Sequence, residues 1–413
     1  MAPLTRQRRK AVAAAAEPSI DPADRLTALP DDARRRILGF LPAQDAVRTC
    51  VLARHWRHLW KSACGLRIGK AGDHAMCGKK LMKFVGSLLQ ARGDSPLETC
   101  ELLVHDYDDE DEPDMNRWIR RVVMCDVRVL RLAFARTLHW FELESLPLIS
   151  RHLTTLVLYV LELNDSFVDF CSCLALEHLT IDHCLLSSFN RISSQSLKSL
   201  SIIGFSSFGS TFRTRIHSPN LILLRMENIK GRAPILERMP SLVEAVVQIN
   251  SINDTCECED GEYFGNCSFE ECDGCYGVAD DTDNCVLLQS LSQAKKLVLL
   301  ANTGMIIFRR DLKWCPIFSN LKTLELNEYW CNSGDLSALA CILQHSPVLE
   351  KLTLQLFCKG PKSKVHIKGS PDPAKRSTAI YEHLKIVEVK CEVLDEEIQN
   401  VLEFLSKLNI CKL

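Results

Sequence analysis

Cysteine is the residue type in this chain with the most chemistry to offer, and it gathers in one segment. The stretch "CECEDGEYFGNCSFEECDGCYGVADDTDNC" holds six of the 20 cysteines. Zinc sites use four thiolate or imidazole ligands, so the pair Cys272 and Cys275 could be completed by Cys267 and by Cys256 or Cys258. The stretch has one C-x-x-C and no histidine, and its acidic composition also fits a disordered loop. We favour the loop and expect no cofactor.

Catalysis by these thiols is disfavoured by their surroundings. Residues 251–293 carry eleven carboxylates and no Lys or Arg, and nearby negative charge opposes formation of a reactive thiolate. The acidic run "DYDDEDEPD" lacks the glycine and the distal glutamate of a calcium loop. The motifs G-x-x-x-x-G-K-[S/T], H-E-x-x-H and G-x-S-x-G are absent from the sequence. The sequence therefore predicts a protein that is not an enzyme.

Length and composition are those of an ordinary globular protein. The 413 residues are 46% hydrophobic and 25% charged, with a net charge of −2, and are enough for two or three domains or a repeat array. No apolar run reaches the roughly 20 residues of a membrane span, so we expect a protein of the nucleus, the cytoplasm or both. Residues 1–70 hold 14 Lys and Arg against 6 Asp and Glu. Any electrostatic binding is therefore local, and a membrane or nucleic-acid partner is not expected.

Three short helices are predicted close to the N-terminus. Pro30 and Pro42 mark the starts of the first two, because proline fits the first turn of a helix. The third, "CVLARHWRHLW", places Trp56 and Trp60 on one apolar stripe. Each indole presents roughly 150–250 Å², and so small a domain cannot hide all of this surface. The stripe either packs on the rest of the chain or binds a partner.

From residue 97 onward the pattern L-x-x-L-x-L, or a relaxed version of it, returns eleven times. The matches begin at residues 97, 127, 153, 176, 197, 221, 242, 294, 321, 349 and 384. This period, mostly 21 to 30 residues, is the signature of a leucine-rich repeat, in which a short strand and a return segment are buried by stacking. The 52-residue step after residue 242 contains the cysteine-rich insert. Helices are expected at 78–92, 115–124 (with Trp118 in the core), 335–347 and 394–408.

The residues between the leucines should line the opposite face of a parallel sheet. Their mixed charge fits a surface that recognises a protein, with a minority of residues acting as anchors. The candidates for this role are Tyr159, Asp182, Arg225, Glu227, Glu325 and Asn327.

Residues 24 to about 68 resemble the F-box of the large plant F-box/leucine-rich-repeat/FBD family. The resemblance rests on "LPDD", on Ile37-Leu38 and Leu41, and on "AVRTCVLARHWRHLW"; residues 344–413 resemble the FBD region. It implies a non-catalytic substrate receptor of an SCF-type ubiquitin ligase, whose F-box docks on the Skp adaptor of a cullin-RING ligase and whose repeats bind a target protein for ubiquitination. The implied adaptor contacts are Leu29, Pro30, Ile37, Leu38, Leu41, Val51, Trp56 and Trp60.

The predicted fold is therefore α/β, a three-helix F-box followed by an irregular leucine-rich-repeat solenoid with a parallel sheet and helical return segments. We divide it into a disordered basic tail (1–22), the F-box (23–70), the repeats (71–343, with an acidic insert at 251–285) and FBD-like repeats with a cap (344–413). Ala33 and Arg34 stand where the family usually has two apolar residues, which predicts weaker packing of the first helix. A second interpretation is a repeat scaffold without a ubiquitin link, whose basic N-terminus binds acidic partners.

Overall fold

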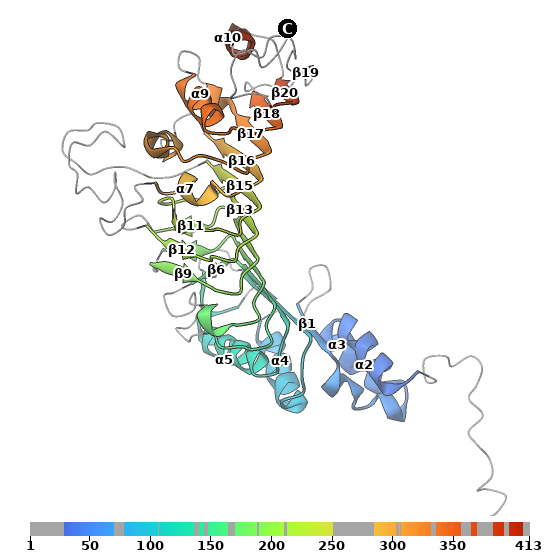
Figure 1. Ribbon diagram of the computed structural model, residues 1–413. Helices are drawn as coiled ribbons and strands as arrows, with labels where there is room; N and C mark the ends of the chain where they lie inside the picture. Colours follow the sequence, from blue (N-terminus) through green and yellow to red (C-terminus); the bar gives the residue numbers. More distant parts are fainter. Residues whose placement is uncertain are drawn as a thin grey trace, which may run out of the picture.

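The computed structural model describes residues 29–69, 78–105, 107–135, 140–143, 148–163, 170–187, 190–209, 213–250, 285–302, 305, 307–331, 336–356, 365–369, 383–391 and 396–407. Within these residues, a long curved sheet carries a group of short helices at its N-terminal end (Figure 1). The basic tail of residues 1–22 and the five zinc candidates of the insert lie outside the described residues. The predictions made for them stay predictions.

One 13-stranded sheet runs through the array, and all neighbouring strands pair in parallel except the last two. Its strands, in spatial order, are β1 (Gly65–Ile68), β2 (Thr99–His105), β3 (Val129–Ala135), β5 (Thr155–Tyr159), β7 (His178–Asp182), β10 (Ser199–Ile203), β13 (Leu223–Glu227), β15 (Glu244–Ile249), β16 (Lys296–Ala301), β17 (Thr323–Asn327), β18 (Lys351–Leu356), β20 (Ile386–Cys391) and β19 (Val365–Gly369). Each of the eleven sequence matches leads into one strand from β2 to β20. The predicted solenoid with a parallel sheet is confirmed.

Leucine spacing explains why these segments pair in one register. Alternate side chains of a strand face opposite sides of the sheet, and in β10 the pattern buries Leu200 and Ile202 while their neighbours are half-exposed. Leu200 stands opposite Leu179 on one side and Leu224 on the other. A one-residue slip would turn these leucines to solvent. The buried side chains form one continuous core from the first repeat to the last helix.

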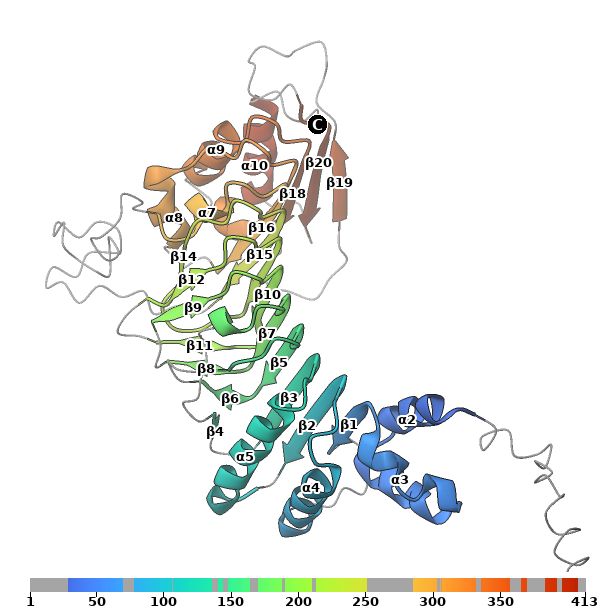
Figure 2. The ribbon, with the colours of Figure 1, turned by 60° about the horizontal axis from the view of Figure 1, so that its bottom comes forward.

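Two kinds of return segment lie along the leucine face of the sheet (Figure 2). The expected helices are present as α4 (Lys79–Arg92), α5 (Glu112–Val123), α9 (Ser337–Gln344) and α10 (Glu396–Lys407), with the shorter α7 (Leu288–Leu291) and α8 (Ile307–Asp311) between them. Trp118 of α5 is buried, as predicted. The remaining short strands are β4 (Phe141–Glu142), β6 (Leu161–Glu162), β8 (Leu185–Leu186), β11 (Ser207–Phe208), β9 (Arg191–Ser193), β12 (Arg215–His217) and β14 (Ile235–Leu236).

The short strands replace helices in the middle of the array. They form a four-stranded and a three-stranded parallel sheet. The repeats that start at residues 153, 176, 197 and 221 have the shortest periods in the chain, 21 to 24 residues. So short a return segment has little room for a helix, and its backbone groups pair with the neighbouring repeat instead.

None of the helices in the described part of the chain is long and apolar enough to cross a membrane.

Ion pairs join neighbouring repeats at the residues that precede their strands. The carboxylate of Glu350, before β18, lies 2.8 Å from Lys322 Nζ and 3.0 Å from Lys385 Nζ, which precede β17 and β20. Hydrogen bonds from the two ammonium groups hold the pKa of Glu350 at about 2, well below its usual 4.5. Such exposed pairs set register more than they add stability.

We expect the Glu350 carboxyl to titrate near pH 2 in the folded protein. A carboxyl group whose pKa falls on folding contributes stability above its unfolded pKa, and this contribution is lost as the pH falls from 4.5 towards 2. NMR of protein labelled with ¹³C-glutamate measures this titration, and the spectrum of Glu350→Gln assigns the signal. Lys322→Ala with Lys385→Ala should return the midpoint to the normal range, and an unchanged midpoint would contradict the assignment.

Candidate binding surfaces

The helical segment at the N-terminus (residues 29–62) is less regular than the sequence predicts. Its first two helices are present as α2 (Asp31–Phe40) and α3 (Ala43–Arg48), each preceded by the expected proline. The prediction of a third helix over residues 50–60 is wrong. In its place are three 3₁₀ turns, η1 (Thr49–Val51), η2 (Arg54–Trp56) and η3 (Leu59–Ser62). The chain turns extended at Ala53, with φ −157° and ψ 163°, and this breaks the helical run.

The two indoles do not form an exposed ridge, contrary to the sequence-based expectation. Trp56 is only 6% exposed and packs with Leu38, Ala46, Leu59 and Ala63 in a small core of the segment itself. Leu38 and Trp56 therefore stabilise this segment and offer almost no surface to a partner. The break at Ala53 separates the stripe into two parts, so that Trp56 and Leu59 join this core while Val51 and Leu52 remain exposed.

Arg34 occupies the position where the resemblance predicts an apolar residue. Its guanidinium carbon lies 5.7 Å from the centre of the Trp56 ring, and its Nη2 lies 2.5 Å from Asp31 Oδ1. A guanidinium over an indole face combines apolar packing with a cation–π attraction. The charged residue thus closes the small core in place of an aliphatic one.

Trp60 joins the helical segment to the repeats. It packs against both the small core and the main core, and with Leu41, Ala43, Leu66 and Leu88 it lines a small pocket at this junction. The carbonyl oxygens of Trp60 and Ala63 accept hydrogen bonds of 3.0 and 2.9 Å from the buried guanidinium of Arg92, at the end of α4. Burial lowers the pKa of Arg92.

The junction is also close-packed at two glycines. Residues Gly39 of α2 and Gly65 of β1 touch backbone to backbone, and a Cβ on Gly65 would lie 2.3 Å from the Gly39 carbonyl oxygen. Only glycine at these positions allows α2 to pack directly on β1. The helical segment and the repeats therefore form one continuous body.

Arg92→Ala should loosen this junction. The buried Ala63 carbonyl oxygen would lose its side-chain donor, and the Trp60 carbonyl oxygen would keep only the 3.3 Å bond from the Ala63 amide. Such losses cost about 1–3 kcal/mol each, so we expect the free energy of unfolding to fall by about 2–4 kcal/mol. Amide hydrogen exchange at residues 59–68 should accelerate, while exchange in β16–β18 should not change. Arg92→Lys is the matched control, because it keeps the charge without the two-pronged donor. Unaltered exchange in Arg92→Ala would contradict this role.

Four apolar side chains of the helical segment remain exposed, and we call them the exposed apolar set. They are Ile37 and Phe40 of α2, 37% and 65% exposed, and Val51 and Leu52 at η1, 82% and 68% exposed. Of the other implied adaptor contacts, Pro30 is also exposed, whereas Leu29, Leu41 and Trp60 are half-buried. The adaptor contacts implied by the resemblance did not include Phe40 or Leu52. Phe40 lies three residues after Ile37, a spacing that places both on one side of a helix.

The six candidate anchors all lie on the face of the sheet that is opposite the buried leucines, which we call the polar face. Arg225 donates two hydrogen bonds, of 2.7 and 3.0 Å, to Glu227 on the same strand. These bonds raise the pKa of Arg225. Glu325 accepts a hydrogen bond from Gln355 and lies 3.8 Å from Lys390 Nζ. Arg225 and Glu227 are thus paired within β13, and Glu325 is held across β17, β18 and β20, so each of these charges has a fixed partner.

Asn327 serves the fold, whereas Asp182 and Tyr159 both contact His183. Asn327 exchanges two hydrogen bonds with the backbone of Ala301, so its amide fixes the end of β16. Asp182 lies 2.7 Å from the ring nitrogen of His183. Tyr159 is 38% exposed and its ring meets His183 edge-on at 5.5 Å.

An aromatic row follows the carboxyl ends of three neighbouring strands. Tyr159, His183 and Phe205 come from the ends of β5, β7 and β10, with His183 and Phe205 6.2 Å apart. Lys230 Nζ lies 5.1 Å from the centre of the Phe205 ring. His183 and Phe205 have positive φ, and such matching bends after successive strands bring these side chains into line. The sequence pattern did not reveal His183 or Phe205, since both lie outside the L-x-x-L-x-L matches themselves.

Comparison with known proteins agrees with this architecture. The F-box domain family matches residues 26–67. An F-box/FBD/LRR-repeat protein of Arabidopsis thaliana is 27% identical and covers 94% of this chain and 90% of its own length. The F-box/LRR-repeat protein 13 of Arabidopsis thaliana is 25% identical over 95% of this chain and 90% of its own. Another F-box/FBD/LRR-repeat protein of that plant is 25% identical over 88% and 83%.

Proposed function

We propose, from the F-box domain at residues 26–67, that this chain is the substrate-recognition subunit of an SCF-type ubiquitin ligase. The F-box would dock on a Skp-type adaptor, and the polar face of the repeats would bind a target protein. Ubiquitin transfer would belong to other subunits, so the chain itself would be non-catalytic and would act in the nucleus, the cytoplasm or both. Holding adaptor and target on one chain raises the effective concentration of the target's lysines near the ligase.

The exposed apolar set is the observation that carries the adaptor half of this proposal. Apolar side chains that remain exposed after a domain has closed its own core are typical of partner surfaces. Val51 and Leu52 sit on a short turn that is held by the buried Trp56 core. The surface is therefore offered by a preformed scaffold, which lowers the entropic cost of binding.

The aromatic row and the Arg225–Glu227 pair support the target half. Aromatic and arginine side chains dominate the binding energy of protein interfaces, and here Tyr159, Phe205 and Arg225 project from β5, β10 and β13 or their ends. β10 and β13 are neighbours in the sheet, and β7, which leads to His183, lies between β5 and β10. We propose this region of the polar face as the centre of target binding.

Co-expression of the full chain with a Skp-type adaptor tests the proposal. We expect a one-to-one complex that survives size-exclusion chromatography in high salt, because an apolar interface is insensitive to ionic strength. Capture of acidic partners that fails steeply as salt rises would favour the scaffold interpretation instead. Arg34 and Arg35 are already paired with Asp31 and Asp32. Absence of any adaptor complex from folded protein would contradict the proposal.

A further inference from the structure

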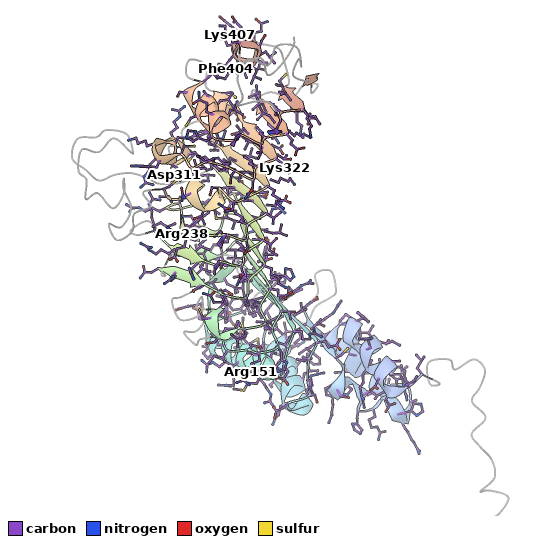
Figure 3. All side chains as sticks on the ribbon, in the orientation of Figure 1. Arg151, Arg238, Asp311, Lys322, Phe404 and Lys407 are labelled. Carbon is purple, nitrogen blue, oxygen red and sulfur yellow. The ribbon has the colours of Figure 1, made fainter. Side chains whose placement is uncertain are left out.

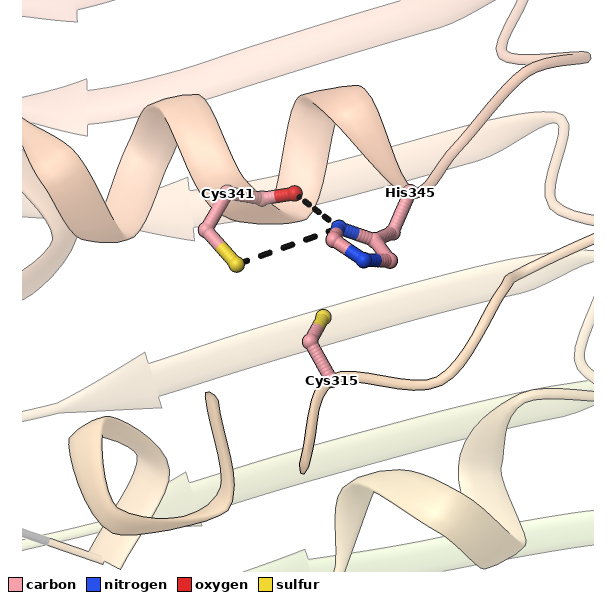
Figure 4. Close-up of side chains that lie close together, drawn as sticks. All are labelled: Cys315, Cys341 and His345. Carbon is pink, nitrogen blue, oxygen red and sulfur yellow. Dashed lines mark hydrogen bonds between the residues drawn. The ribbon is translucent and has the colours of Figure 1, made fainter. Parts of the chain in front are cut away.

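Two thiols and an imidazole meet between neighbouring return segments near the C-terminal end of the array (Figure 4). Cys341 and His345 lie four residues apart along α9 and its end, which places them on one side of the helix. Cys315 follows the 3₁₀ turn η6 (Leu312–Trp314) of the preceding repeat. One ligand atom from each of the three residues lies within 4.8 Å of the other two. The cluster is far in sequence from the cysteine-rich insert.

The separations within this cluster approach those of metal ligands. Zinc binds sulfur at about 2.3 Å and nitrogen at about 2.0–2.1 Å, so tetrahedral ligand atoms lie roughly 3.5–3.8 Å apart. The imidazole of His345 lies beside the Cys341 thiol, with 3.8 Å between Nδ1 and Sγ, and one ligand atom from each of the three residues lies within 4.8 Å of the other two. All three side chains are half-buried. An ion could therefore reach them from solvent, and a water molecule could complete its coordination.

Backbone contacts hold the three residues in place. The amide of Phe318 donates a 2.8 Å hydrogen bond to the His345 carbonyl oxygen, which ties the segment after Cys315 to the end of α9. His345 Nδ1 lies 2.8 Å from the Cys341 carbonyl oxygen. With its proton on Nδ1, the ring donates to this oxygen and keeps the lone pair of Nε2 for a metal. A backbone carbonyl commonly fixes the tautomer of a metal-binding histidine in this way.

We propose that Cys315, Cys341 and His345 form a Zn²⁺ site with three protein ligands and one position for water. Thiolate and imidazole ligands select zinc over magnesium or calcium, which prefer oxygen. The bound ion would fasten the return segment between β16 and β17 to the one between β17 and β18. The site would thus stiffen the array where it meets the C-terminal repeats. It does not depend on the proposed ubiquitin-ligase role.

Metal titration of the full reduced chain tests this site. The cysteines of residues 251–284 are first replaced by serine, so that they cannot compete. We expect this parent protein to bind one equivalent of Co²⁺ with the visible bands of tetrahedral cobalt–thiolate coordination, and Zn²⁺ to displace it. Loss of a direct ligand in Cys341→Ser or His345→Ala should weaken binding by more than the about 10–100-fold that loss of a second-shell partner costs.

Two further variants make the result decisive. Cys315 lies outside α9, so Cys315→Ala removes a ligand without disturbing this helix. Cys171→Ser removes an exposed thiol elsewhere and should bind metal as the parent does. Circular dichroism of the metal-free proteins should be the same for all variants. The proposal is overturned if the parent binds no metal or if the ligand variants bind it with unchanged affinity.

Discussion

Aspartate at both Val51 and Leu52 is expected to abolish capture of a Skp-type adaptor while the chain stays folded. Both side chains are more than two-thirds exposed, so the substitutions leave the domain core intact. Truncating a central apolar anchor commonly costs 2 kcal/mol or more, and a carboxylate placed in an apolar interface adds its desolvation. A combined loss of about 4 kcal/mol weakens binding about a thousandfold. Calorimetric titration with purified adaptor measures the change.

Matched variants separate docking from folding. Ile37→Asp with Phe40→Asp tests the α2 part of the exposed apolar set independently. Met124→Asp introduces the same charge at an exposed apolar residue after α5, away from the helical segment, and should bind adaptor normally. Leu38→Ala and Trp56→Ala would test stability rather than docking, because both side chains are buried. Wild-type affinity in both aspartate pairs would remove the adaptor surface proposed above.

Asp311→Ala should be the most destabilising single substitution among those considered. The Asp311 carboxylate is completely buried on the helical side of the array (Figure 3). It accepts hydrogen bonds from the backbone amides of Val286, Leu287 and Leu288, at 3.0, 2.6 and 3.0 Å, and faces Arg310 at 3.3 Å. Removing one member of such a buried charged network costs about 3–5 kcal/mol.

Urea unfolding followed by tryptophan fluorescence measures this loss, since Trp330 is fully buried in the same region. Asp311→Asn keeps one acceptor oxygen and should lose less stability than Asp311→Ala. Asp114→Ala removes an exposed carboxylate that pairs with Arg117, and a change of no more than about 0.5 kcal/mol is expected there. Equal stability of Asp311→Ala and wild type would show that these hydrogen bonds contribute nothing net.

Asp311 also explains how the array continues after its longest interruption. The three amides that it binds begin directly after Cys285, which is itself buried in the core. Cys285, at the predicted end of the insert, thus packs with the repeats. A carboxylate from the following repeat positions the returning chain, so the length of residues 251–284 places little demand on the fold.

The repeat architecture was predictable because each repeat carries its own signal. The leucines recur at strand spacing, and a single register buries them all, as Leu179, Leu200 and Leu224 illustrate. Helices such as α5 were predictable for the same reason, since Trp118 and its neighbours mark one face. Local periodicity was enough wherever burial follows directly from it.

The candidate sites were less predictable because they depend on contacts between distant segments. Trp56 is buried because the helical run breaks at Ala53, and the spacing of apolar residues in the sequence does not indicate this break. The strand at Gly65–Ile68 was missed because it is short and pairs only with β2. The cluster of Cys315 with Cys341 and His345 was missed because its members are separated by 26 and 4 residues, a spacing that matches no compact zinc motif.

The short strand β1 sets the distance between the helical segment and each repeat. It is hydrogen-bonded into the same sheet as the repeats, which fixes the helical segment relative to them. In the adaptor role proposed above, each additional strand between the F-box and the bound target would lengthen the span by about 4.8 Å. A target bound near β5 and one bound near β18 would then be held at different distances from the ligase, and only lysines within reach at that distance would be modified.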